Sequence, residues 1–377
     1  MKFRHFIISV AAVAVTAIGL FGLQWLSSAD AADARDARPG MPIFEVDPSW
    51  PQVPPKWKLG NVSAIAFDDK DNVFVLHRPL TLPDDQLAVA APPVMVFDSS
   101  GKFLQAWGGP GAGYEWPERE HGITIDHKGF VWIGGNHCAE DNRGLAARLK
   151  PVGDDQMLKF TQAGKFVMQI GKSNQSTGNA DTRNLRQPAD AAYYPKTNEL
   201  FVADGYGNHR VIVFDADSGA FKRMWGAFSN KPVDNAPCPP VNLGNKEDGD
   251  GPGQFGRPHA IRISNDGLVY VGDHENRRLQ VFTPDGKFVR QAMHPSEPFG
   301  RSLALSADPE QRYLYTGGAK GVFVVDRRTM ETIGQIIGGG VIGSGHEIAT
   351  DSKGNLYIAH LNLGAQKLIF KGIAPAP

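Results

Sequence analysis

Short hydrophobic runs alternate with turn residues along most of this 377-residue chain. Six runs share one form, an apolar triplet that follows a turn rich in Gly, Asp or Asn: residues 73–75, 131–133, 200–202, 269–271, 313–315 and 356–358. Short runs of β-branched and aromatic residues between turn signals are typical of β-strands. The pattern therefore predicts an all-β protein with six repeats.

The spacing of the triplets indicates the type of repeat. Their first residues lie 58, 69, 69, 44 and 43 residues apart. The two shorter spacings match the ~40–50-residue period of a four-stranded propeller blade. The longer spacings indicate inserted loops, and residues 138–155 and 229–253 are the two candidates. Each insertion is expected to be either a lid over the channel mouth or a solvated excursion.

The repeat contains four strands, which are clearest at residues 259–263, 269–271, 278–282 and 286–289. Because such a unit cannot bury both faces alone, six units are expected to form a six-bladed β-propeller around a channel. A set of separate β-sandwiches is the alternative. The last repeat ends after residues 367–370 without an outer strand. Residues 42–46 are expected to supply this strand and so close the ring.

The N-terminal residues 1–31 have the features of a secretory signal peptide. Lys2 and Arg4 precede a long apolar run, and small residues at 29–31 offer a cleavage site. The run is also long enough to span a bilayer, so an uncleaved N-terminal anchor is the alternative. The expected organisation is this export segment, a linker with the closing strand at 32–59, and the propeller at 60–377.

An exported chain is expected in the periplasm or outside the cell, in contact with a membrane only if the N-terminal segment is retained. Such compartments permit disulfides. The chain has two cysteines, Cys138 and Cys238, and the sequence leaves open whether they pair.

Composition and charge exclude several classes of protein. The chain is 41% hydrophobic and 21% charged, which is ordinary for a globular protein and excludes a disordered chain or a coiled coil. Its net charge is -1, whereas binding to nucleic acid favours a clearly basic face. We therefore expect no nucleic-acid partner. The expected partner is a small-molecule or peptide substrate at the channel mouth of a monomer.

Three histidines occupy the same position in alternate repeats. Ten residues before each triplet stand, in order, Ser63, His121, Asp190, His259, Leu303 and His346. This position opens the innermost strand of a blade, and repeats two, four and six are a third of a turn apart, so the imidazoles should converge on the axis. Three imidazoles around an open position are typical of catalytic zinc, although other first-row metals accept the same ligands. We predict a zinc or similar site there.

Loops after the triplets should lie at the same mouth, since the first strand of each blade runs away from it and the second returns. Arg78 is a candidate for holding a carboxylate, and Tyr206 for acting as a base beside a metal. Simple packing is the alternative for both. Acidic and amide side chains in these loops are expected to tie the turns: Asp204, Asn208, Asp273 and Asn276. Four loop histidines, either solvated or extensions of the metal site, are His77, His137, His209 and His274.

These motifs resemble the peptidyl-α-hydroxyglycine α-amidating lyases, a branch of the NHL-repeat six-bladed propellers. The resemblance extends over about residues 60–358 and rests on four segments: 60–63 with 77–78, 121–126, 187–190 with 202–210, and 253–278. It implies that His121, His259 and His346 bind zinc, that Tyr206 is the base and that Arg78 engages the substrate. It also implies a structural calcium ion, held by the backbone oxygens of Ile65 and Ile123 and by the side chain at the position of Glu347.

The activity implied by the resemblance is a metal-dependent lyase reaction that cleaves the N–C bond of an α-hydroxyglycine to give an amide and glyoxylate. The chain departs from the family pattern at four positions. Ser344 stands in place of a methionine, Arg186 and Gly207 replace two disulfide cysteines, and Glu347 replaces an aspartate. Two alternatives stay open, a non-catalytic NHL-propeller binding module and a calcium-dependent propeller lactonase or hydrolase.

Overall fold

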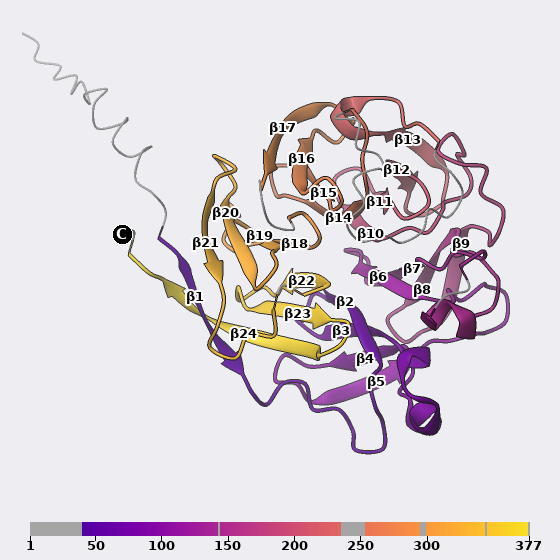
Figure 1. Cartoon of the computed structure of the whole chain (residues 1–377), viewed down its shortest axis with the longest axis horizontal. Helices are drawn as coiled ribbons and strands as arrows, with labels where there is room; N and C mark the ends of the chain where they lie inside the picture. The colour runs from indigo at the N-terminus through magenta and orange to yellow at the C-terminus, as the bar shows by residue number, and fades with distance from the viewer. Residues whose placement is uncertain (1–39, 142–143, 235–252, 295–298, 344, 376–377) are drawn as a thin grey trace, which may run out of the picture. The chain divides into compact units, whose positions relative to one another are not determined.

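A computed structural model describes residues 40–141, 144–234, 253–294, 299–343 and 345–375. These residues form six four-stranded antiparallel sheets around a common axis, which confirms the predicted all-β six-bladed propeller (Figure 1). The export segment 1–31, most of the insertion 229–253, Cys238 and Ser344 lie outside the described residues. Within the described ranges no helix has the length and apolar character needed to cross a membrane.

The blades follow one another in chain order, and each lays down its strands from the axis outward. Blade one contains β2 (Asn61–Phe67), β3 (Val73–Arg78), β4 (Val94–Phe97) and β5 (Phe103–Trp107). Blade two contains β6 (Glu120–Ile125), β7 (Phe130–Gly135), β8 (Gln156–Thr161) and β9 (Phe166–Gly171). Blade three contains β10 (Asp190–Tyr194), β11 (Glu199–Asp204), β12 (Arg210–Asp215) and β13 (Phe221–Trp225).

The second half of the chain repeats this order. Blade four contains β14 (Pro258–Ile263), β15 (Val269–Asp273), β16 (Arg278–Phe282) and β17 (Phe288–Met293). Blade five contains β18 (Leu303–Leu305), β19 (Tyr313–Gly317), β20 (Val322–Asp326) and β21 (Thr332–Ile336). Blade six contains β22 (Glu347–Thr350), β23 (Leu356–His360), β24 (Gly364–Ile373) and β1 (Pro42–Asp47). Short 3-10 helices lie in the loops: η1 (Pro79–Thr81), η2 (Asp84–Val89), η3 (Gly144–Arg148) and η4 (Ala227–Ser229).

Burial explains why the apolar triplets are the clearest signal in the sequence. All six triplets lie in the second strand of a blade, and β3, β11, β15 and β19 are buried at every position. These strands have a neighbouring blade on each face, so both faces are apolar. The outermost strands, such as β17, instead alternate exposed positions with half-buried or buried ones. The hydrophobic clusters accordingly lie between blades; one joins Phe201 and Trp225 of blade three to Ile261 and Phe282 of blade four.

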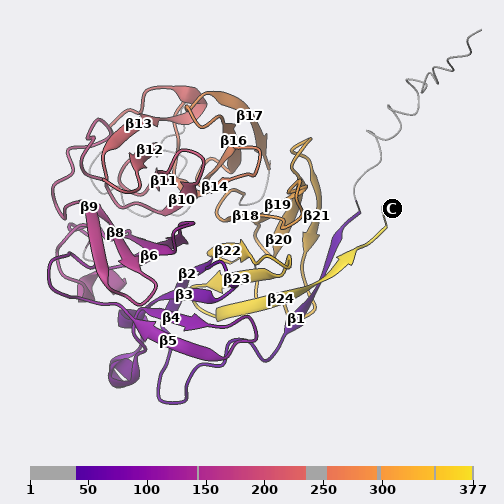
Figure 2. The ribbon, with the colours of Figure 1, turned by 180° about the vertical axis from the view of Figure 1, so that it is seen from behind.

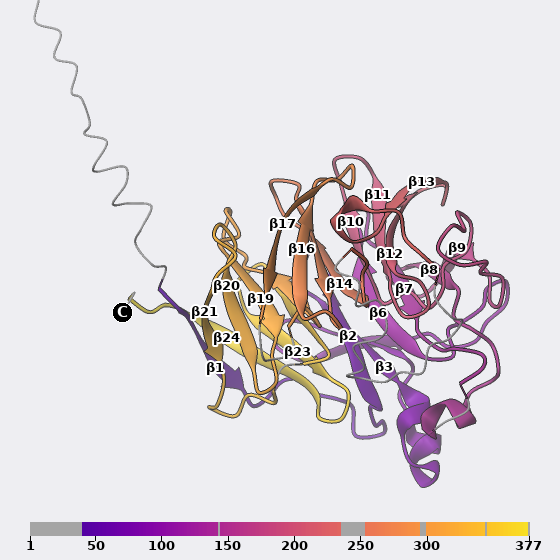
Figure 3. The same ribbon diagram turned by 45° about the horizontal axis from the view of Figure 1, so that its top comes forward.

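The innermost strands line the axis, as the view from behind shows (Figure 2). These strands are β2, β6, β10, β14, β18 and β22, and each contacts the innermost strands of both neighbouring blades. The N-terminal strand closes the ring as predicted, because β1 pairs antiparallel with β24 and places Phe44 opposite Phe370 (Figure 3). The Phe44 ring also contacts Tyr315 of blade five, with ring centroids 5.9 Å apart.

Candidate metal centre

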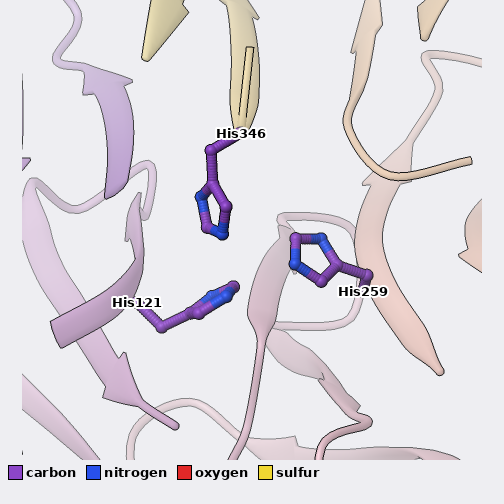
Figure 4. Close-up of side chains that lie close together, drawn as sticks. All are labelled: His121, His259 and His346. Carbon is purple, nitrogen blue, oxygen red and sulfur yellow. The ribbon is translucent and has the colours of Figure 1, made fainter. Parts of the chain in front are cut away.

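The three in-phase histidines converge on the axis (Figure 4). His121 is the second residue of β6, His259 is the second residue of β14, and His346 directly precedes β22. All three side chains are buried, and one ring nitrogen of each lies within 4.8 Å of the other two. The predicted convergence is therefore found in the structure.

Local irregularities in the strands aim these side chains inward. The β6–β7 register shifts between Glu120 and Ile123, and the β14–β15 register shifts between Pro258 and Ala260. An extra residue in a strand re-aims its side chain. Next to His121, a β-carbon on Gly122 would lie 2.5 Å from the Ala189 carbonyl oxygen, so only glycine fits against blade three.

Each imidazole is held by a hydrogen bond to a backbone carbonyl of the next blade. The Nδ1 atoms of His121, His259 and His346 lie 2.7, 2.6 and 2.7 Å from the carbonyl oxygens of Ala189, Arg301 and Ser63. A carbonyl only accepts, so each Nδ1 carries the proton and each neutral ring turns an Nε2 lone pair to the axis. This second hydrogen bond is the usual support of a metal-binding histidine.

Burial lowers the pKa of all three histidines well below the ordinary value. Neighbouring imidazoles and the positive charge of Arg78 or Arg301 lower it further. The rings are therefore neutral at physiological pH, the form that coordinates a metal.

Tyr206 lies in the loop after β11, and its hydroxyl oxygen is 2.9 Å from Nε2 of His121 and 3.0 Å from Nε2 of His259. The hydroxyl has one proton, so it can donate to only one of these two nitrogens. At the other nitrogen, a lone pair of the hydroxyl oxygen faces the lone pair of Nε2 with no proton between them. A cation among the three Nε2 atoms would relieve this surplus of lone pairs, so the residues fit a transition-metal ion with an open fourth position.

The loop that carries Tyr206 is fixed from two sides. A β-carbon on Gly205 would lie 2.0 Å from the Pro258 carbonyl oxygen, so glycine lets the loop approach blade four closely. Asp204 accepts hydrogen bonds from the Arg186 N–H, the Asn208 amide and Arg210 Nε. This confirms the expected turn-tying role of Asp204 and Asn208.

Blade four repeats the arrangement. Asp273 accepts from the backbone N–H groups of Gly256 and Arg257 and from the Asn276 side chain, as expected for this pair. The Arg257 guanidinium lies 4.7 Å from the centre of the Tyr206 ring and pairs with Glu275. Blade four thus supports the tyrosine of blade three.

Arg78 ends β3 at the same mouth and is buried. Its Nε donates to the Glu120 carbonyl oxygen at 2.6 Å, whereas its Nη2 has no hydrogen-bond partner within the described ranges. Burial and the charge of Arg119 lower the pKa of Arg78 to about 10, so the guanidinium stays charged at neutral pH. A buried cation with an open donor beside the imidazoles suits a carboxylate.

Arg301 is a residue of this mouth that the sequence argument missed. Its carbonyl holds His259, and its Nε donates to Nε2 of His274 at 2.9 Å. His274 also contacts Glu275 and does not join the three-histidine cluster. A signal was available, since Arg301 lies two residues before Leu303, the position in phase with the histidines.

Neither alternative predicted for the other loop histidines holds for His77, His137 and His209, which are neither solvated nor part of the three-histidine cluster. All three side chains are buried, and His77 lies in β3 rather than in a loop. Each has a ring nitrogen within 3.0 Å of a backbone carbonyl, those of Pro92, Lys150 and Gly256. These hydrogen bonds give the three side chains a structural role outside the cluster.

The residues implied in calcium binding lie further along the channel. Ile65 and Ile123, on the adjacent strands β2 and β6, line a channel cavity of about 680 Å³. Glu347 is buried and pairs with Arg262 Nη2, while Arg262 Nη1 pairs with Asp190 at 2.5 Å. With this guanidinium between the carboxylates, the set does not fit a calcium ion.

The two cysteine positions of the family pattern remain adjacent without a disulfide. The Gly207 N–H donates to the Arg186 carbonyl at 3.1 Å, and a β-carbon on Gly207 would lie 2.4 Å from the Arg186 side chain. Elsewhere, Cys138 is not a free thiol.

Comparison with known proteins agrees with this architecture. The NHL repeat model matches residues 185–214 and 255–282, which span most of blades three and four. Peptidyl-glycine alpha-amidating monooxygenase A of Xenopus laevis is 30% identical over 284 residues, covering 70% of this chain and 26% of that protein. A probable peptidyl-alpha-hydroxyglycine alpha-amidating lyase of Caenorhabditis elegans is 24% identical over 330 residues, covering 81% of each chain. NHL repeat-containing protein 3 of Mus musculus is 26% identical over 247 residues, covering 65% of this chain and 58% of that protein.

The chain spans only about a quarter of the length of the amidating monooxygenases that it matches. The lyase from Caenorhabditis elegans, in contrast, is matched over most of its length. Together with the six blades and the two matched repeats, these similarities identify the chain as an NHL-repeat β-propeller that is similar to the peptidyl-alpha-hydroxyglycine alpha-amidating lyases.

Proposed function

We propose that this protein is a metal-dependent lyase that cleaves the N–C bond of an N-acyl-α-hydroxyglycine and releases an amide and glyoxylate. The observation that supports this most directly is the Tyr206 hydroxyl, 2.9 and 3.0 Å from Nε2 of His121 and His259. A phenol at this point can exchange a proton with a substrate bound at the three imidazoles. The lyase names of several relatives support the same reaction.

His121, His259 and His346 would hold the metal ion, which would act as a Lewis acid toward the substrate oxygen. Tyr206, acting as the base beside this site, would take the proton of the substrate hydroxyl. The C–O bond becomes the aldehyde of glyoxylate, and the N–C bond breaks with its electron pair moving to nitrogen. The same proton then passes from Tyr206 to that nitrogen, which completes the amide. Atoms and charge balance, and no redox change is involved.

Arg78 would orient the substrate. Its Nη2 is buried at the mouth and has no hydrogen-bond partner within the described residues, and in such a place a charge-assisted hydrogen bond to the glycine carboxylate is strong. Holding the carboxylate fixes the adjacent carbon, which carries both the hydroxyl and the scissile bond, toward Tyr206.

The test compares the wild type with Tyr206→Phe, both purified without chelator. Metal per chain is measured by mass spectrometry, and glyoxylate and amide are measured after incubation with N-benzoyl-α-hydroxyglycine. We expect about one transition metal ion per chain in both proteins, equimolar products from the wild type, and roughly 10²–10⁴-fold slower turnover in the variant. Metal-loaded, folded wild type without product above the blank would overturn the proposal.

The two alternatives predict other outcomes of the same test. A calcium-dependent lactonase or hydrolase has less support, since imidazoles rather than carboxylates meet at this mouth. A folded protein that takes up no metal on reloading would instead favour the NHL-propeller binding module.

A further inference from the structure

A second charged centre lies on the propeller axis, beside the three imidazoles in sequence. Arg262 follows His259 by three residues on β14, and Glu347 directly follows His346. The Arg262 guanidinium joins three blades. Its Nη1 donates to Asp190 Oδ2 of β10 at 2.5 Å, and its Nη2 donates to Glu347 Oε1 of β22.

The two carboxylates are more deeply buried than the guanidinium. The side chains of Asp190 and Glu347 are 1% and 6% exposed, and that of Arg262 is 21% exposed. Asp190 is further held by the N–H groups of Ala191 and Ile261. The carboxylates would be costly to bury without a cation, so Arg262 neutralises part of their charge inside the ring.

Arg262 also borders the cavity that Ile65 and Ile123 line. The guanidinium therefore pairs with Glu347 and borders the same cavity as both isoleucines, the positions that the family resemblance assigns to a structural calcium ion. Calcium needs six to eight oxygen ligands at about 2.3–2.6 Å, including carboxylate oxygens that no other cation occupies.

We propose that the Arg262 guanidinium takes the place of this calcium ion, so that a cation of the chain itself joins the blades at the axis and the protein needs no calcium. A guanidinium pairs with carboxylates through a planar fork and keeps its charge at any physiological pH. It cannot dissociate, unlike a bound ion. This inference concerns the ring and is independent of the proposed lyase activity.

The substitution of glutamate for aspartate at position 347 agrees with this assignment. The guanidinium reaches Glu347 from blade four, which is two blades away from β22 around the axis. A longer carboxylate side chain extends further toward it. The departure from the family pattern at Glu347 and the presence of Arg262 are then parts of one arrangement.

The experiment measures calcium binding and thermal unfolding of the zinc-loaded full-length protein, with calcium chloride as the probe and magnesium chloride as the ion control. For the wild type we expect no bound calcium after dialysis and an unfolding temperature that calcium does not change. For Arg262→Ala we expect a lower unfolding temperature that calcium, but not magnesium, partly restores. Calcium should bind this variant at least tenfold more tightly, because two carboxylates are left without their cation.

Arg223→Ala is the matched control. Arg223 makes a two-point ion pair with Glu199 at 2.8 and 2.7 Å, away from the axis. Its loss should also destabilise the protein, but calcium should not restore stability.

About one calcium ion bound to the wild type, with a higher unfolding temperature, would overturn the proposal. A folded Arg262→Ala variant that calcium neither binds nor stabilises would overturn it as well. If that variant does not fold, the wild-type measurement still decides, and Arg262→Met, which fills the same volume without charge, replaces it.

Discussion

Two layers of side chains lie along the propeller axis, the three-histidine cluster and the Asp190–Arg262–Glu347 set, and they differ in charge. In the first layer, blades two, four and six contribute three neutral imidazoles that turn their Nε2 lone pairs toward the axis. In the second layer, blades three, four and six contribute two carboxylates and the guanidinium that neutralises them. The lone pairs of the three imidazoles suit a bound metal cation, whereas the two carboxylates are already paired with a guanidinium of the chain. The same ring can therefore build an open site and a closed one side by side.

A single irregularity in β14 makes this possible. His259 and Arg262 are an odd number of residues apart, and a regular strand would point them to opposite faces. The register shift between Pro258 and Ala260 places an extra residue at His259 and resets the alternation. Both side chains then reach the axis from one strand.

The largest effect is expected from removing one imidazole of the first layer. In His259→Ala we expect the metal content to fall from about one ion per chain to near zero and glyoxylate release to fall at least ~10³-fold. The measurement is metal analysis together with the product assay. His127→Ala removes an exposed histidine and should leave both unchanged. Full metal content in His259→Ala would refute the three-histidine site.

The Glu347→Gln substitution removes one of the two carboxylates of the second layer. One buried carboxylate is lost and Arg262 keeps only Asp190, so we expect a loss of about 3 kcal/mol in the free energy of unfolding. Urea unfolding monitored by tryptophan fluorescence measures this. Metal content should stay at the wild-type value, because Glu347 supplies no ligand to the imidazoles. A parallel loss of metal would show that the two layers are one cooperative unit.

The Arg78→Lys substitution tests whether substrate binding at the first layer can be weakened without loss of the metal ion. Lysine keeps the charge but loses the planar fork, so we expect KM to rise roughly tenfold to a hundredfold. Metal content should not change. Steady-state kinetics on metal-loaded protein provide the measurement. An unchanged KM would remove Arg78 from the substrate site.

The smallest expected effect concerns His77, a buried histidine outside both layers. Its Nδ1 accepts from the Gly60 N–H at 3.2 Å and its Nε2 lies 3.0 Å from the Pro92 carbonyl. Burial lowers the pKa of His77 from 6.5 to about 4. The unfolded chain then binds the extra proton first, so this stabilisation is complete above pH 6.5 and is lost as the pH falls toward 4.

From this pKa difference, the wild type should lose roughly 2 kcal/mol through His77 between pH 7.5 and pH 5. His77→Gln keeps a donor and an acceptor but does not titrate, so its stability should fall less over the same range. Thermal unfolding of both proteins across this range measures the difference. Equal pH dependence in the two proteins would contradict the assignment.

The repeat and the three-histidine layer could be predicted because both are periodic in the sequence. The buried second strands mark each blade, and His121, His259 and His346 share one phase. The second layer could not be predicted. Pairing of Arg262 with Glu347 depends on a strand irregularity and on reach across the axis, and neither leaves a periodic signal.

The burial of three further histidines could not be predicted from the sequence either. His137 and His209 have polar, turn-rich neighbours, and His77 lies at the end of β3, yet all three side chains are buried. Arg301 was not predicted because it lies just outside the phase of the repeat. It supports the metal centre through its carbonyl oxygen, which contacts His259, and through its side chain, which contacts His274.

Closure of the ring by β1 has a consequence for the order of folding. The strand at Pro42–Asp47 pairs with β24 near the other end of the propeller, so blade six can be completed only when both ends of the chain are present. His346 belongs to that blade. A metal ion held by all three histidines would therefore need blade six in place beside blades two and four, and its binding free energy would add to the stability of that state. The rate of metal uptake during refolding would thus report when blade six is in place.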